Sequence, residues 1–488
     1  MSACNSLSRH SSRGTGFIRE GGVTDSKKCT ECTGPFPDES GPTGIVLSAW
    51  HRRVPPTVWC FAYQKLIRGL NMGMPRIDGD RLWASLLALA ECGATAKGGV
   101  NRQALSAEEH AAWRLVIDWA RDAGLTASTD AAGNLFLTLP GSDPQALPVL
   151  TGSHLDSQPT GGRFDGVYGV AAALEALLAL AESDVRPVCD VIAVAWMNEE
   201  GSRFAPGMMG SQAFAGVMSM AEIEAVRDAQ GISVAEALAE QMAVFAELPR
   251  RSLGFPLAAY LEAHIEQGPV LEAREKVIGM VTGIQGKKTW EITLSGMEGH
   301  AGTLAMADRE DALAAFSRIA QRLYEEIGGH DTMVKFTIGR LRVEPNAPSV
   351  VPAKVVFSID LRHPDNPVLE HLGQRLLAIC TEQTAPCRVA IKALVDAPSN
   401  LFDADLQAQI EASAKRREIP SLHLLSAAGH DARYMAPLCP SAMIFIPCKG
   451  GVSHAEHEWA EPTHVTAGAQ VLLDTLLTLC TDTSRGEP

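Results

Sequence analysis

The sequence predicts an α/β catalytic domain, in which helices flank a mostly parallel sheet, and an inserted α+β lid or dimerisation domain with a four-stranded sheet. Continuous apolar runs such as residues 191–196 alternate with long apolar helices such as 166–181, as expected for strands that are buried on both faces. After about Ile284 the strands alternate apolar and polar residues instead, and the first pattern returns near Ser441. A chain that leaves one pattern and re-enters it indicates an inserted domain.

Composition narrows the class of protein. The chain has 488 residues, 46% hydrophobic and 20% charged, as in ordinary soluble globular proteins. Its net charge of −15 disfavours nucleic acid and anionic membranes as partners, since both attract basic surfaces. We find no apolar stretch long enough to span a bilayer, and residues 1–16 lack the apolar core of a signal peptide. The eleven cysteines are scattered, so we expect reduced thiols and a cytoplasmic protein.

Residues 1–73 differ from the rest of the chain. They are rich in Ser, Gly, Pro, Arg and Thr and have no sustained hydrophobic period, so we expect a disordered N-terminal extension. Cys29 and Cys32 have zinc-knuckle spacing, but the nearby cysteines and histidines are irregularly spaced, which favours a tail without a metal site.

The catalytic domain is expected in two segments, 74–283 and 396–482, on either side of the inserted domain at 284–395. A capping box, Ser106 to Glu109, opens one helix, and Gly124 ends it. The periodicity further predicts helices at 80–90, 166–181, 309–325, 370–385 and 465–480, and strands at 135–139, 149–153, 191–196, 290–294, 333–343, 354–362 and 441–446.

Candidate ligands follow the ends of the apolar strands, where open α/β sheets place their sites. In a strand-end His-x-Asp, the carboxylate of Asp156 can accept the imidazole N–H of His154 and leave the other ring nitrogen for a metal; the alternative is a polar turn. Asp165 precedes a helix, so it could bridge two cations or be a plain N-cap. Glu199 and Glu200 are adjacent carboxylates, which suggests one metal ligand and one general base.

Two histidines complete the set. His264 lies on an apolar strand, where a histidine is more often a core residue than a ligand. His454 follows a buried strand, and His457 competes with it for the same role. Ligands rich in nitrogen and oxygen, without thiolates, suit zinc, manganese or cobalt.

Five short segments are distinctive in this order. They are Gly-Ser-His-Leu-Asp-Ser (152–157), Asn-Glu-Glu-Gly-Ser-Arg-Phe (198–204), His-Ile-Glu-Gln-Gly-Pro-Val-Leu-Glu (264–272), His-Ala-Gly-Thr (300–303) and Gly-His-Asp-Ala (429–432). Together they resemble the amidase family that holds N-carbamoyl-L-amino-acid hydrolases, β-ureidopropionases and allantoate amidohydrolases, within the dimetal aminoacylase/carboxypeptidase superfamily. The similarity covers roughly residues 76–482.

The resemblance implies roles for these residues. Asp165 would bridge two divalent ions per subunit, zinc or else manganese, cobalt or nickel. His154 and His264 would complete one metal site, Glu200 and His454 the other, with Asp156 supporting them. Glu199 would be the base. His300 would stabilise the oxyanion, and the substrate contacts would be His300, Ser349, Arg362, Gly429 and His430.

The family resemblance also implies a homodimer, formed through the inserted domain, in which His300 reaches the partner's site. The implied reaction is metal-dependent hydrolysis of an N-carbamoyl-L-amino acid to the amino acid, CO2 and ammonia. Allantoate amidohydrolase, β-ureidopropionase, a broader N-acyl amino acid amidase and a non-catalytic binding protein on the same fold are the alternatives. Ser349 stands where the family usually has Asn, which leaves the substrate open, and Ala305 and Ala427 are further departures.

Overall fold

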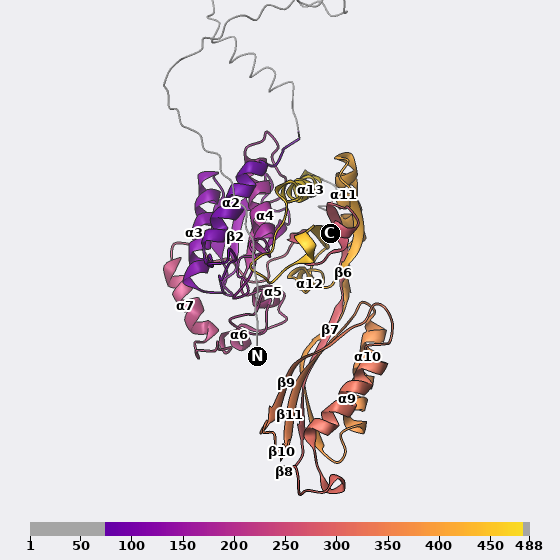
Figure 1. Cartoon of the computed structure of the whole chain (residues 1–488). Helices are drawn as coiled ribbons and strands as arrows, with labels where there is room; N and C mark the ends of the chain where they lie inside the picture. The colour runs from indigo at the N-terminus through magenta and orange to yellow at the C-terminus, as the bar shows by residue number, and fades with distance from the viewer. Residues whose placement is uncertain (1–73, 482–488) are drawn as a thin grey trace, which may run out of the picture. The chain divides into compact units, whose positions relative to one another are not determined.

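The protein, described here over residues 74–481 by a computed structural model, contains a large mixed sheet and a separate four-stranded antiparallel sheet (Figure 1). Within the described residues the large sheet has nine strands, in the order β1-β2-β4-β3-β5-β15-β6-β13, with β14 beside β6. Its strands are β1 Thr126–Thr129, β2 Leu135–Leu139, β3 Val149–His154, β4 Val191–Trp196, β5 Ala259–Ile265, β6 Ile278–Ile284, β13 Asn400–Leu401, β14 Ser421–Ser426 and β15 Ser441–Ile446.

The centre of this sheet is parallel and its flanks are mixed. Strands β4, β3, β5 and β15 run parallel to one another, and β14 runs parallel to β6. Strands β1 and β2 at one side, and β6 and β13 at the other, pair antiparallel with their neighbours, except for β6 with β14. The predicted α/β class is confirmed, and the sheet is mixed where the sequence predicted mostly parallel pairing.

Both faces of the central strands are covered. On β4, Val191, Ala193 and Ala195 belong to one apolar cluster, and Ile192, Val194 and Trp196 belong to another. Successive side chains point to opposite faces of a strand, so a strand covered on both sides reads as a continuous apolar run. The helices of the catalytic domain are α2 Gly79–Glu91, α3 Ala107–Asp122, α4 Val167–Ala181, α5 Met209–Phe214, α6 Met220–Glu224, α7 Val234–Val244, α8 Val270–Ala273, α11 Ala404–Arg416, α12 Ala432–Met435 and α13 Pro462–Thr481.

Helix α4 is the central helix of the larger apolar cluster. Its residues 167–180 are all buried, against β3, β4 and β5 on one side and α2 and α13 on the other. This explains why its sequence is apolar in every direction instead of amphipathic. A truncation such as Leu177→Ala would leave a cavity and cost about 2–5 kcal/mol.

The cap of α3 differs from the predicted capping box in one contact. Ser106 accepts the backbone N–H of Glu109, as predicted. The carboxylate of Glu109 accepts the N–H of Leu105 rather than that of Ser106, with Oε2 2.5 Å from the nitrogen. The side chain is thereby buried at the start of the helix.

The four-stranded sheet has the order β12-β7-β11-β9, and all its pairs are antiparallel. Burial alternates along β7, with Trp290, Ile292 and Leu294 packed under two helices. This is the half-buried pattern that the sequence shows after Ile284. The elements are β7 Gly286–Ser295, β8 Gly299–His300, α9 Ala312–Glu326, β9 Lys335–Glu344, β10 Val350–Val351, β11 Lys354–His363, α10 Asn366–Glu382 and β12 Arg388–Ala397.

Two expectations from the sequence are not tested by the fold. The domain boundaries at residues 284 and 396 stay a prediction. The predicted extension at residues 1–73, with Cys29 and Cys32, lies outside the described residues. Within residues 74–481, every helix is too short or too polar to traverse a bilayer.

Candidate metal centre and active site

The candidate ligands converge because parallel strands end at one edge of the sheet. His154 is the last residue of β3 and pairs with Trp196 at the end of β4, three residues before Glu199. His264 lies near the end of β5, paired with Phe445 of β15, and His454 follows β15. The neighbouring central strands thus deliver their polar side chains to a single place.

One group of possible ligands contains His154, Asp165 and His264. One ligand atom from each lies within 4.8 Å of the others, and all three residues are buried. Asp165 Oδ1 is 3.2 Å from His264 Nε2 and 4.0 Å from His154 Nε2. The outer nitrogen of His154 is also 3.6 Å from Glu199 Oε2.

A second group contains Asp165, Glu200 and His454, again with ligand atoms within 4.8 Å of one another. His454 Nε2 is 3.3 Å from Asp165 Oδ2 and 3.5 Å from Glu200 Oε2. The two oxygens of Asp165 therefore face two different groups, as a bridging carboxylate requires. The alternative of a helix cap does not apply, because the N-cap of α4 is Gly166 and no side chain caps it.

Gly166 is where this packing becomes too tight for a side chain. Its φ is +67°, a conformation that glycine tolerates best. A Cβ atom there would lie 2.2 Å from the ring of His154. The residue after Asp165 must therefore be glycine, because the backbone passes so close to the ring of His154.

Charge is unevenly shared among these groups. Burial disfavours the carboxylate of Asp165, but hydrogen bonds with His264 and His454 hold its pKa well below the usual range. The reciprocal contact with Asp165 outweighs burial at His264 and raises the pKa of that histidine to about 9. Its contact with Asp165 likewise raises the pKa of His454 to about 9. At His154, burial lowers the pKa to about 4.

The two glutamates are costly to ionise together without a cation. Burial, followed by repulsion from Asp431 and Glu200, raises the pKa of Glu199 well above its usual range. Burial and the nearby Asp165 raise the pKa of Glu200 to about 8. Divalent ions would remove this penalty, because a cation favours the charged form of an adjacent carboxylate. The donor set therefore fits two such ions.

Asp156 has a different role from the predicted one. The Nδ1 atom of His154 lies 2.9 Å from the backbone carbonyl of Asp156, and its carboxylate is farther away, at 3.6 Å. That carboxylate instead accepts the backbone N–H groups of Glu199 and Glu200, each at 3.1 Å. The short loop after β3 therefore fixes both the ring of His154 and the backbone of the two glutamates. Residues that contact metal ligands often orient them in this way.

Several contacting residues were not predicted from the sequence. Glu458 Oε1 accepts the N–H groups of Phe164 at 2.9 Å and Asp165 at 3.1 Å. Gln158 donates to Glu200 Oε2 at 2.7 Å, and Gln267 donates to Asp165 Oδ2 at 2.8 Å. Gln158 lies four residues after His154 and Gln267 three residues after His264, so sequence proximity was the available signal.

A third possible ligand group, Glu262, His264 and His430, is less suited to a metal. The carboxylate of Glu262 already accepts the hydroxyls of Ser153 and Tyr260 and the N–H of Ala432. Satisfied oxygens in a buried network favour a structural role.

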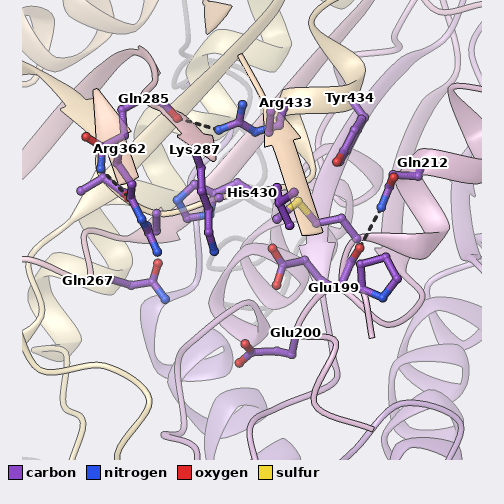
Figure 2. A pocket seen from close by; sticks show the side chains of 18 of the residues that line it. Glu199, Glu200, Gln212, Gln267, Gln285, Lys287, Arg362, His430, Arg433 and Tyr434 are labelled. Atoms are coloured by element: carbon purple, nitrogen blue, oxygen red, sulfur yellow. Dashed lines mark hydrogen bonds between the residues drawn. The ribbon is translucent and has the colours of Figure 1, made fainter. Parts of the chain in front are cut away.

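The ligands open onto a cavity of about 940 Å³ (Figure 2). Gly429 and His430 of the catalytic domain and Arg362 of β11 line it, as do all five candidate ligands and Glu199. Arg362 Nη1 donates to the carbonyl of Ala427 at 2.9 Å, so the arginine contacts both sheet systems. His300 and Ser349 are not among the lining residues; they lie on the paired strands β8 and β10 or next to them.

The family follows from comparison with known proteins. The profile of peptidase family M20/M25/M40 matches residues 150–478. The N-carbamoyl-L-amino-acid amidohydrolase of Rhizobium meliloti is 39% identical over 407 residues, which covers 82% of this chain and 96% of that protein. This chain belongs to the M20/M25/M40 family.

Two further relatives of this M20-family chain are amidases or amidohydrolases. A hydantoinase/carbamoylase-family amidase from Burkholderia multivorans has a similar structure, with a TM-score of 0.76, 40% identity, and coverage of 84% of this chain and 99% of that one. The allantoate amidohydrolase of Bacillus subtilis is 35% identical over 402 residues, or 80% of this chain and 95% of that protein. The predicted family and the predicted class, a hydrolase of carbon–nitrogen bonds, are confirmed.

Proposed function

We propose that this M20-family hydrolase cleaves the carbamoyl C–N bond of an N-carbamoyl-L-amino acid and releases the amino acid, CO2 and ammonia. The observation that carries the proposal is the position of Asp165, whose two oxygens face two ligand groups while Glu199 lies beside one of them. The named relative at 39% identity supports this substrate class.

Two divalent ions per subunit are part of the proposal. His154 and His264 with Asp165 would hold one ion, and Glu200 and His454 with Asp165 would hold the other. Imidazole and carboxylate donors without thiolates suit zinc, manganese, cobalt or nickel. When bound, such ions lower the pKa of a water molecule and polarise the carbamoyl oxygen.

Glu199 is the proposed general base. It is buried at the cavity wall beside the ligand group of His154, and a cation held there would keep its carboxylate charged and able to accept a proton. Glu199 accepts the proton of the attacking water as the water oxygen adds to the carbamoyl carbon. The bond between the carbamoyl carbon and the amino-acid nitrogen then breaks, and Glu199 gives the proton to the leaving amine. The carbamic acid that remains splits into CO2 and ammonia.

Arg362 is the proposed binding group for the substrate carboxylate. A guanidinium can form two parallel hydrogen bonds with a carboxylate. In the structure it forms such a pair with Asp360, at 2.8 and 3.1 Å, and it lines the cavity. Gly429 and His430 line the same cavity, and His300 and Ser349 would reach it from a second subunit of a cytoplasmic homodimer.

Ammonia release tests the proposal. Protein loaded with zinc, manganese or cobalt is expected to release ammonia from N-carbamoyl-L-amino acids and not from the D-enantiomers. Elemental analysis should find about two ions per chain. A metal-loaded protein that releases no ammonia from any N-carbamoyl-L-amino acid would contradict the proposal, and one that is inactive on allantoate and N-carbamoyl-β-alanine as well would favour a binding protein.

Allantoate amidohydrolase is the second candidate, because the Bacillus subtilis relative with that name is 35% identical to this chain. Allantoate and N-carbamoyl-β-alanine therefore belong in the same assay, the latter as a test for β-ureidopropionase activity. A kcat/KM for either of them above that for every N-carbamoyl-L-amino acid would replace the first proposal.

A further inference from the structure

Three cationic side chains line the same cavity as the metal ligands. Lys287 of β7 and Arg362 of β11 are directly opposite each other in the antiparallel pairing of their strands. Arg433 of α12 lines the same cavity. Figure 2 shows Lys287 and Arg362 pointing into the cavity, near Gln267. Like charges that face each other across two strands destabilise a sheet unless an anion lies between them.

Too few anions contact these three cations to balance them. Asp360 pairs with Arg362, and its Oδ2 is 3.5 Å from Lys287 Nζ. Within residues 74–481, Asp360 is the one residue with a carboxylate within 4 Å of Lys287 or Arg362. Arg433 donates to the neutral carbonyls of Pro398 and Gln285, and no carboxylate of the described chain lies within 4 Å of it.

A second carboxylate near these cations already forms an ion pair with a lysine outside the cavity. Asp396 lines the cavity, but its carboxylate is 2.8 Å from Nζ of Lys288, which is not a lining residue. Burial is the main factor that lowers the pKa of the Arg433 guanidinium, and the nearby Arg362 lowers it further. Burial therefore leaves the Arg433 guanidinium poorly hydrated, with the positive charge of Arg362 nearby.

Three cations and one carboxylate leave two positive charges for a ligand to balance. The carboxylate of an N-carbamoyl amino acid, bound at Arg362, balances one of them. The second charge would be balanced by another anionic group on the same molecule, and the side chain of Lys287, which is 36% exposed, lines the cavity where that group would lie.

We propose that the substrate has two carboxylates: an N-carbamoyl derivative of a dicarboxylic L-amino acid, with its side-chain carboxylate bound by Lys287. This inference rests on the proposed function and narrows its substrate class. Lys287 acts on binding only, and the water and proton transfers at Glu199 are unchanged.

Isosteric pairs of substrates test the inference. N-carbamoyl-L-glutamate and N-carbamoyl-L-glutamine have the same shape and differ in the charge of the side chain, as do the aspartate and asparagine derivatives. We expect kcat/KM to favour the dicarboxylate by about tenfold or more, mainly through KM, since a hydrogen bond with a charged group contributes about 1.5–3 kcal/mol. The preference should shrink as salt screens the charges.

Variants then assign the preference to a residue. Lys287→Met should reduce the ratio to about one, and Lys287→Arg should keep it, since guanidinium also binds carboxylate. Lys392→Met is the matched control, because Lys392 is exposed on β12 and does not line the cavity. It should leave the ratio as in the unaltered protein.

The outcomes separate this inference from the proposed function. Equal kcat/KM for both members of each pair would overturn the inference and leave the proposed function standing. A preference that survives in Lys287→Met would overturn the assignment to Lys287. Ammonia release from none of the N-carbamoyl substrates by metal-loaded protein would overturn both.

Discussion

At the scale of single residues, the two adjacent glutamates are expected to have separable roles. Glu200 lies 3.5 Å from His454 in a ligand group, and Glu199 lies 3.6 Å from His154 outside the two groups that share Asp165. Glu199→Gln should keep both metal ions and lose about 10²–10⁴-fold in kcat, the usual contribution of a general base. Glu200→Gln should lose metal instead.

Metal content by elemental analysis and kcat, measured on the same two preparations, check the assignment. Both variants keep the side-chain volume and one acceptor oxygen, so each serves as the control for the other. Equal metal loss in the two variants would refute the division of roles.

Metal binding is expected to compete with protons. Without metal, the contacts with Asp165 raise the pKa values of His264 and His454 to about 9, so both imidazoles carry a proton at pH 7. A metal binds the deprotonated ring, so each ion must displace protons. Affinity should therefore rise from pH 6 to about pH 9 and level off above the raised pKa values.

Calorimetry at pH 7 in buffers of different ionisation enthalpy measures this release directly. We expect at least one proton to be released per chain as the metal binds. An affinity that is constant over this pH range, or that falls as pH rises, would contradict the protonated state of the two histidines.

At the scale of elements, the loop after β3 depends on a buried arginine. Arg102 is 1% exposed and donates to the carbonyls of Leu155 at 2.6 Å, Leu89 at 2.6 Å and Cys92 at 2.8 Å. Its own backbone N–H and C=O pair with Ser157 at 2.9 and 2.7 Å. Arg102 thus fixes the loop that carries Asp156, which in turn holds the glutamate backbone.

Arg102→Met should therefore affect both stability and the site. It removes the side-chain donor to three carbonyls of the loop and the end of α2, and we expect a loss of about 3 kcal/mol or more in the free energy of unfolding. Metal affinity should fall about 10–100-fold, as for other residues that support metal ligands. Denaturant unfolding and zinc titration measure the two effects, with Arg186→Met, an exposed site, as control. An unchanged zinc affinity in a folded Arg102→Met protein would limit the arginine to a structural role.

The elements that could be predicted from the sequence are those whose burial produces a clear pattern of apolar residues along the chain. Strands β2, β4 and β15 match their predicted ranges because they are covered on both faces. Strand β14, Ser421–Ser426, is half-buried with His423 exposed, and it shows no such pattern. Antiparallel pairing at the flanks of the sheet could not be predicted either, since pattern reveals burial and not direction.

The candidate site shows the same limit. The ligand residues could be chosen from the sequence because motifs mark them. Glu458 could not, because its part depends on two N–H groups nearly 300 positions earlier in the chain. The contact of Asp156 with two backbone N–H groups could not be predicted either, since a sequence shows which residues are neighbours and not the geometry of a loop.

At the scale of the whole molecule, the inserted domain presents two predicted substrate contacts away from the cavity. His300 and Ser349 lie together, since β8 and β10 pair Val350 with His300 and the N–H of Ala301 donates to the carbonyl of Ser349. His300 is exposed, and neither residue lines the cavity. They can reach a metal centre by domain closure or by meeting the site of a second subunit.

Mixing two inactive variants distinguishes these routes. In a dimer of one His300→Ala chain and one Glu199→Gln chain, a histidine supplied by the partner restores the site that keeps Glu199. Random exchange of equal amounts makes half of the dimers hybrid, each with one intact site, so about a quarter of the unaltered activity should return. A histidine acting within its own chain leaves a defect in every site. Mass spectrometry of differently tagged chains shows whether the subunits have exchanged. If they have, and ammonia release stays at the level of the separate variants, His300 acts in the active site of its own chain. Closure of the inserted domain would then be the movement that brings it there.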